Sequence, residues 1–189
     1  MNIPKGYLYF LLFLSIIGIF QSCIEKPVFN ITPEIEFLAI ENIRVGEGLT
    51  AKDSIIISVK FKDGDGDLGL KDEDTLAPYS DFITNNEGIE ELNMFRHNYF
   101  IDFYRQEGEE FVKVEFPDPT LNFNGRFPYL NEPETEGGPL EGVLSYTFDI
   151  TPSPLIPNNS VLKFEVTIAD RALNLSNVIE TDTVLVNQN

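Results

Sequence analysis

The sequence predicts an all-β fold, a single β-sandwich of about seven strands that follows an apolar leader. Apolar and polar residues alternate along several segments, as they do in strands with one buried face. Turn-forming residues separate these segments, and no segment shows the spacing of an amphipathic helix. The 189 residues suffice for one domain of ordinary size. Such a series of strands is typical of a sandwich.

The strands are expected, in chain order, at residues 34–45, 54–62, 98–105, 110–116, 142–150, 161–170 and 176–186. The second strand is clear because its apolar side chains share one face: Ile55, Ile57, Val59 and Phe61. The third and fourth strands form a hairpin that bends at Gly108. The sixth strand has the same alternation, with Leu162, Phe164, Val166 and Ile168 on one face.

Two long inserts interrupt the strands. Residues 63–97 are acidic, and a short helical turn is expected near residues 88–95 ("GIEELNMF"). Residues 117–138 are rich in proline, glycine and aromatic residues. Loops of this length are usually functional or irregularly packed.

The first 22 residues read as a leader to be removed. Lys5 gives it a positive start, and the apolar run 7–20 is too short for a comfortable membrane span of about 20 residues. The run ends at "FQSC", which resembles the signal of bacterial lipoproteins, although Phe20 and Gln21 depart from that pattern. The resemblance implies a signal peptide at 1–22, a covalent lipid on Cys23 and a tether at 23–33. An ordinary secreted protein, or an anchor helix with a chance cysteine, are the alternatives.

The resemblance also bears on localisation. Aspartate after the acylated cysteine often marks retention in the inner membrane in that family, and this chain has Ile24. We therefore expect attachment to the outer membrane through the lipid, on its periplasmic or its surface face. The formal net charge of −18 argues against nucleic acid and anionic headgroups as partners. A protein or a glycan remains as the expected partner.

The last part of the chain carries a distinctive set of residues before, in and after its sixth strand: Leu155, Pro157, Phe164, Val166, Ile168, Asp170, Asn174 and Ser176. In these residues it resembles fibronectin type III and related immunoglobulin-like domains. The resemblance implies an immunoglobulin-like sandwich over residues 34–189. The usual core tryptophan is absent, and the expected substitutes are Phe37, Phe61, Phe100 and Phe148. The motifs "DGDGDLGL" and "DRALNLSN" also resemble those of a group of Gram-negative surface lipoproteins.

The stretch "FKDGDGDLGL" is the candidate metal site. Alternating aspartate and glycine supplies oxygen ligands on a tightly curved backbone, which suits calcium. In a fibronectin-like sandwich the loops after the second and sixth strands lie at one end, so the expected ligands are Asp63, Asp65, Asp67, Asp170 and Asn174. An EF-hand is disfavoured by Leu68 at the position that needs glycine. The alternative is a solvated turn in which Asp63 and Asp170 cap backbone amides or pair with Arg171.

The residues do not indicate catalysis. His97 is the single histidine and has no Ser or Cys motif beside it, so we expect no enzyme and no zinc site. We favour a structural or protein-interaction module. A glycan-binding accessory protein of a polysaccharide-uptake system is the alternative, with Phe123, Phe127 and Tyr129 as its rings. The triplet "DTL" resembles an O-glycosylation sequon and makes Thr75 a candidate acceptor.

Overall fold

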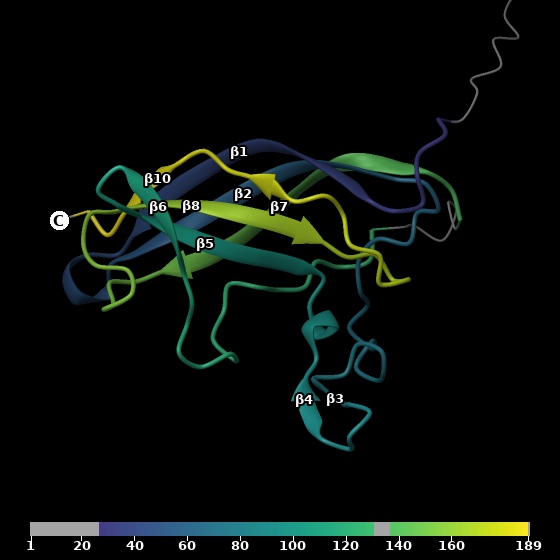
Figure 1. Cartoon of the computed structure of the whole chain (residues 1–189). Helices are drawn as coiled ribbons and strands as arrows, with labels where there is room; N and C mark the ends of the chain where they lie inside the picture. The colour runs from purple at the N-terminus through teal and green to yellow at the C-terminus, as the bar shows by residue number, and fades with distance from the viewer. Residues whose placement is uncertain (1–26, 131–136, 189) are drawn as a thin grey trace, which may run out of the picture.

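The computed structural model describes residues 27–130 and 137–188. The expected signal peptide, Cys23 and the beginning of the tether lie outside the described residues. Two antiparallel sheets face each other in a sandwich, with the C-terminus at one end (Figure 1). The first sheet contains β1 (Glu34–Val45), β2 (Lys52–Asp63) and β7 (Leu140–Ile150), in that order. The second has the order β10 (Val184–Val186), β8 (Ser160–Ile168), β5 (Tyr99–Glu107) and β6 (Glu110–Val114), with β9 (Ile179–Glu180) paired to β8.

This arrangement confirms the predicted all-β sandwich. Among the seven main strands the first, second and fifth share one sheet, and the third, fourth, sixth and seventh belong to the other. Apart from the fourth strand, which pairs with the third, that distribution is the one of an immunoglobulin constant-type sandwich. A short 3-10 turn, η1 (Gly48–Thr50), joins β1 to β2.

The alternation seen in the sequence decides which side chains are buried. The four apolar residues of β2 and the four of β8 lie in one core between the sheets, and all those of β8 are fully buried. Burying one such side chain contributes about 1.5–3 kcal/mol. β2 and β8 therefore hold the sandwich together, and the polar residues that alternate with these apolar ones, such as Ser58 and Lys163, lie on the opposite face of each strand.

The aromatic substitutes for tryptophan are partly different from those expected. Phe61 and Phe148 are in the core, but Phe37 and Phe100 are only half-buried. Phe103 and Phe127 are buried in their place. Phe148 contacts the edge of the Phe164 ring, with centroids 5.4 Å apart. The sequence did not predict the burial of Phe127, because that residue belongs to an irregular segment without alternation of apolar and polar residues.

The expected strand at 176–186 is two short strands. Between them Thr181 is buried, and its hydroxyl accepts a hydrogen bond from the Phe164 amide at 3.0 Å. The Thr181 amide donates to the Phe164 carbonyl at 2.9 Å. A side chain thus replaces part of the backbone ladder and divides the strand.

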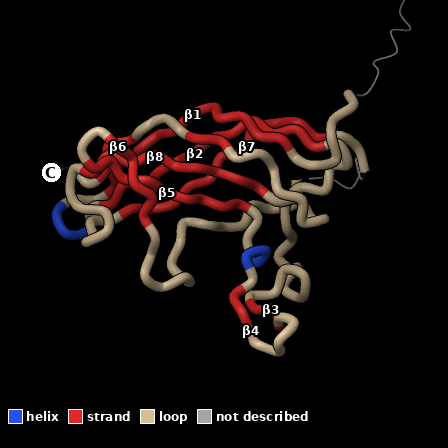
Figure 2. Tube along the Cα trace, viewed as in Figure 1, coloured by secondary structure: helices blue, strands red, loops and turns tan. Residues whose placement is uncertain are grey.

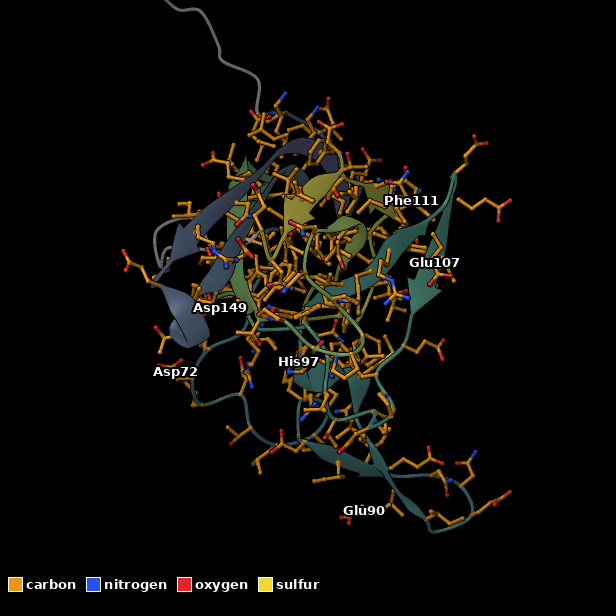
Figure 3. The ribbon with its side chains drawn as sticks, turned by 90° about the vertical axis from the view of Figure 1, so that its left-hand side faces the viewer. Asp72, Glu90, His97, Glu107, Phe111 and Asp149 are labelled. Carbon is orange, nitrogen blue, oxygen red and sulfur yellow. The ribbon has the colours of Figure 1, made fainter. Side chains whose placement is uncertain are left out.

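Residues 71–97, which we call the arm, extend away from the two sheets (Figures 1 and 2). The arm contains a two-stranded hairpin, β3 (Phe82–Thr84) with β4 (Glu90–Leu92), and a 3-10 turn, η2 (Met94–Arg96). The expected helical turn near residues 88–95 therefore contains β4, and helical geometry begins only at Met94, in η2. In Figure 3, Glu90 lies on the outer part of the arm and His97 lies where the arm meets the sandwich.

Candidate metal centre

The aspartate loop begins at the last residue of β2. Asp63 is fully buried, and its Oδ2 accepts a hydrogen bond from the Asp67 amide at 3.0 Å, which curls the loop. The curl brings carboxylate oxygens of Asp63, Asp65 and Asp67 within 4.8 Å of one another. Three acidic side chains that are spaced two residues apart therefore converge on one point.

Two glycines permit close backbone approaches around this loop. A Cβ on Gly64 would lie 2.5 Å from the carbonyl oxygen of Phe29, because the N-terminal segment crosses the loop there. Gly69 has φ +93°, and a Cβ on it would lie 2.1 Å from the carbonyl oxygen of Pro128. The loop is thus enclosed by the tether on one side and by the 125–130 segment on the other.

The enclosed carboxylates have unused acceptors. The Oδ1 atoms of Asp63, Asp65 and Asp67 are buried, and no hydrogen-bond donor among the described residues reaches them. Buried polar atoms are nearly always paired, and an orphaned one often indicates a missing water or ion. Three such atoms lie together in this loop, where they could hold a metal ion.

Burial raises the pKa of two of these groups. Desolvation, and then the charges of Asp65 and Asp67, raise the pKa of Asp63 from 3.8 to about 6. Desolvation, and then the charges of Asp170 and Asp65, raise the pKa of Asp67 to about 6 as well. Carboxylates in this position are destabilised when ionised, and a nearby cation would relieve that destabilisation.

Asp170 lies beside the cluster but outside its centre. Residues Leu68 and Asp170 form an isolated antiparallel bridge, as the expected meeting of the two loops requires. Both oxygens of Asp170 are engaged by Asn174, from its backbone amide at 2.7 Å and its side-chain amide at 2.8 Å. Asp170 is buried, and desolvation raises its pKa. Of the five expected ligands, three therefore converge, Asp170 adds negative charge, and Asn174 holds Asp170 in place.

Arg171 connects the cluster to the arm, and it does so through a partner that sequence reasoning missed. Its guanidinium forms a two-pronged ion pair with Asp74, rather than with Asp63 or Asp170. This pairing lowers the pKa of Asp74. Both oxygens of Asp74 are thus engaged by Arg171. The pair joins residues 97 positions apart in the chain, which is why no local pattern indicated it.

The remaining candidates lie apart from the cluster. Thr75 is exposed on the arm, where a modifying enzyme could reach it. His97 is half-buried, and desolvation followed by the charges of Arg96 and Arg126 lowers its pKa.

Two of the three candidate aromatic rings, those of Phe123 and Phe127, pack inward, whereas Tyr129 is half-buried and lies beside the Lys71 and Arg171 side chains. Phe127 is buried, and Phe123 contacts Phe148 with ring centroids 4.7 Å apart. Asn98 binds the Phe127 backbone through both its amide nitrogen and its amide oxygen. These contacts fill the sandwich edge, so Phe123 and Phe127 do not form the exposed platform that glycan stacking requires.

Comparison of the chain with protein-family models, with curated proteins and with solved structures finds no significant match. Within the described residues, the structure has no helix of the length and apolarity needed to cross a membrane.

Proposed function

We propose that this chain is a non-catalytic module, attached to the outer membrane through a lipid on Cys23, that presents the arm to a protein partner and is stabilised by calcium. The observation that supports this proposal most directly is the set of three buried, unpaired carboxylate oxygens at the root of the arm. The lipid and the outer-membrane location come from the resemblance of the leader to lipoprotein signals.

Calcium suits the donors better than other common metals. It binds oxygen at about 2.3–2.6 Å, so one ion can bridge oxygens up to roughly 5 Å apart. The 4.8 Å limit for the cluster agrees with that span. Calcium also completes its shell readily with water and carbonyl oxygen, whereas magnesium gives up its waters reluctantly. Asp63, Asp65 and Asp67 would be the protein ligands, and Asp170 would add attraction from beside them.

The arm is the proposed interaction surface. Among the described residues no other strand pairs with its β3–β4 hairpin, and the arm exposes these apolar side chains: Leu76, Phe82, Ile83, Ile89 and Met94. Exposed apolar groups gathered in this way are typical of contact sites. Acidic residues surround them, including Asp81, Glu87, Glu90 and Glu91. This charge disfavours a second copy of the acidic chain and favours a basic partner surface with apolar side chains.

Titration calorimetry of the full chain in detergent tests the metal site. Calcium should bind with a dissociation constant of order 10⁻⁴–10⁻³ M, as in other extracellular modules, and magnesium more weakly. Asp65→Asn removes one proposed ligand charge and should weaken binding. Asp72→Asn is the matched control, because Asp72 is exposed near the root of the arm (Figure 3) and carries no unpaired buried oxygen. Equal weakening by both substitutions, or no heat with wild type, would refute the site.

A further inference from the structure

The arm depends on its root for order. A two-stranded hairpin is at best marginally stable by itself. Here both faces of β3–β4 are open, and Phe82 and Ile89 are each more than half exposed. The tip is closed locally by Asn85, whose side-chain oxygen accepts hydrogen bonds from the amides of Glu87 and Ile89. These bonds fix the turn but do not attach the arm to the sandwich.

The attachment is concentrated near Arg171. Its guanidinium binds Asp74, and it lies 5.5 Å from the centroid of the Tyr79 ring and 5.4 Å from that of Tyr129. The Tyr79 hydroxyl donates to the Arg171 carbonyl at 2.6 Å. Arg126 adds two bonds, to the carbonyls of Lys71 and Asp74. Arg171 thus holds the first part of the arm with both its side chain and its backbone.

The same residue is part of the wall of the aspartate cluster. The Arg171 amide donates to the Asp67 carbonyl at 3.2 Å, and Arg171 directly follows Asp170. The residue therefore touches the proposed metal site through its backbone and the arm through its side chain.

We infer that occupancy of the aspartate cluster by a divalent cation controls the order of the arm, and that Arg171 transmits this control. The inference rests on the proposed calcium site and adds its regulation. The Arg171 amide is bound to the Asp67 carbonyl and Arg171 follows Asp170, so the position of Arg171 depends on how the aspartate loop is held. A bound cation balances the carboxylates of the cluster and holds them together, which keeps Arg171 where its guanidinium reaches Asp74. Without the cation the carboxylates repel one another, the loop and Arg171 shift apart, and the arm loses its main attachment. The interaction surface would then be formed only where calcium is present.

Hydrogen exchange of the full chain in detergent, followed by mass spectrometry, tests this coupling. At calcium tenfold above its dissociation constant, linkage limits the added protection to about 11-fold, so exchange of residues 82–92 should slow by up to about tenfold relative to EGTA. In Arg171→Gln the calorimetric calcium signal should persist, but exchange of the arm should be fast and insensitive to calcium. Arg171→Lys keeps the charge but loses the two-pronged pair with Asp74, so it should also speed exchange of the arm and weaken the effect of calcium on that exchange. Arg105→Gln, a change on β5 at a residue paired with Glu107, is the matched control and should retain the calcium effect.

The outcomes separate the inference from the proposed function. If wild type shows no calcium heat, the proposed metal site fails. If calcium binds but the exchange of the arm does not change, the site stands and the coupling is refuted. If Arg171→Gln and Arg171→Lys, confirmed as folded by their melting transitions, keep the wild-type response to calcium, Arg171 does not transmit it.

Discussion

Replacing Asp67 with asparagine should stabilise the protein in EGTA and destabilise it in calcium. In EGTA at pH 7 the Asp67 carboxylate is ionised although burial and neighbouring charges raise its pKa to about 6. A rise of about two units from 3.8 corresponds to roughly 3 kcal/mol of unfavourable free energy in the folded state. Asparagine keeps a similar shape and an acceptor oxygen, but it removes the charge.

The net gain in EGTA should be smaller than that figure. The amides of Arg171 and Ala172 oppose the rise in the pKa of Asp67, and a neutral acceptor would bind them less strongly. We expect a net stabilisation of about 1–2 kcal/mol, which raises the melting temperature by roughly 2–8 °C for a domain of this size. In calcium the same substitution removes a ligand charge, so the variant should gain less from calcium than wild type.

Thermal and urea unfolding of both proteins, each in EGTA and in millimolar calcium, measures this reversal. The matched control is Asp182→Asn, because Asp182 is exposed between β9 and β10, away from the cluster. A solvated turn would give a small loss for Asp67→Asn that is the same in both buffers. That result would refute the reasoning.

Three further predictions follow from the same structure. The stability advantage of Asp67→Asn over wild type in EGTA should disappear as the pH falls from 7 to 4. The reason is that Asp67 of the folded wild type takes up a proton at about pH 6, whereas in the unfolded chain its pKa is 3.8. Unfolding titrations at several pH values check this, and a stability difference that does not change with pH would contradict it. Phe164→Ala should lower the free energy of unfolding by about 3–5 kcal/mol, because Phe164 is fully buried. Lys163→Ala should lower it by about 1 kcal/mol or less, because it removes only a partly exposed ion pair with Glu180 and contacts to two rings. Equal losses in urea melts would mean that the inward face of β8 is misassigned. Cys23→Ala should abolish incorporation of a palmitate analogue and leave the precursor uncleaved or release the protein from membranes, and undiminished labelling would rule out Cys23 as the lipid site.

Alternation made the sandwich predictable from the sequence. Over residues 55–61 of β2 and 162–168 of β8 every second residue is apolar, and burial of those residues follows directly from the pleat of a strand. The proximity of the loops that follow β2 and β8 was predictable for the same reason, because the sandwich topology places both loops at one end. The sequence therefore predicts Asp170 beside the aspartate loop, where the Leu68–Asp170 bridge places it.

The arm was not predictable in the same way. β3 and β4 have three residues each and lie exposed, so their sequence carries no buried face to detect. The ion pair of Arg171 with Asp74 depends on a contact across the fold, and charged residues near both positions made several pairings equally plausible from the sequence. Asn174 looked like a ligand by type, yet its amide hydrogen-bonds Asp170, which only the local geometry could reveal.

Calcium-dependent stability of the wild-type chain tests the central claim most directly. The measurement is the melting temperature of the full chain in detergent, in EGTA and in 1 mM calcium. With a dissociation constant near 10⁻⁴ M, linkage adds about 1.4 kcal/mol, which should raise the melting temperature by a few degrees. Magnesium at the same concentration should raise it less. Equal melting temperatures in EGTA and calcium, together with no heat in the calorimetric titration, would contradict the account and leave the loop as a solvated acidic turn.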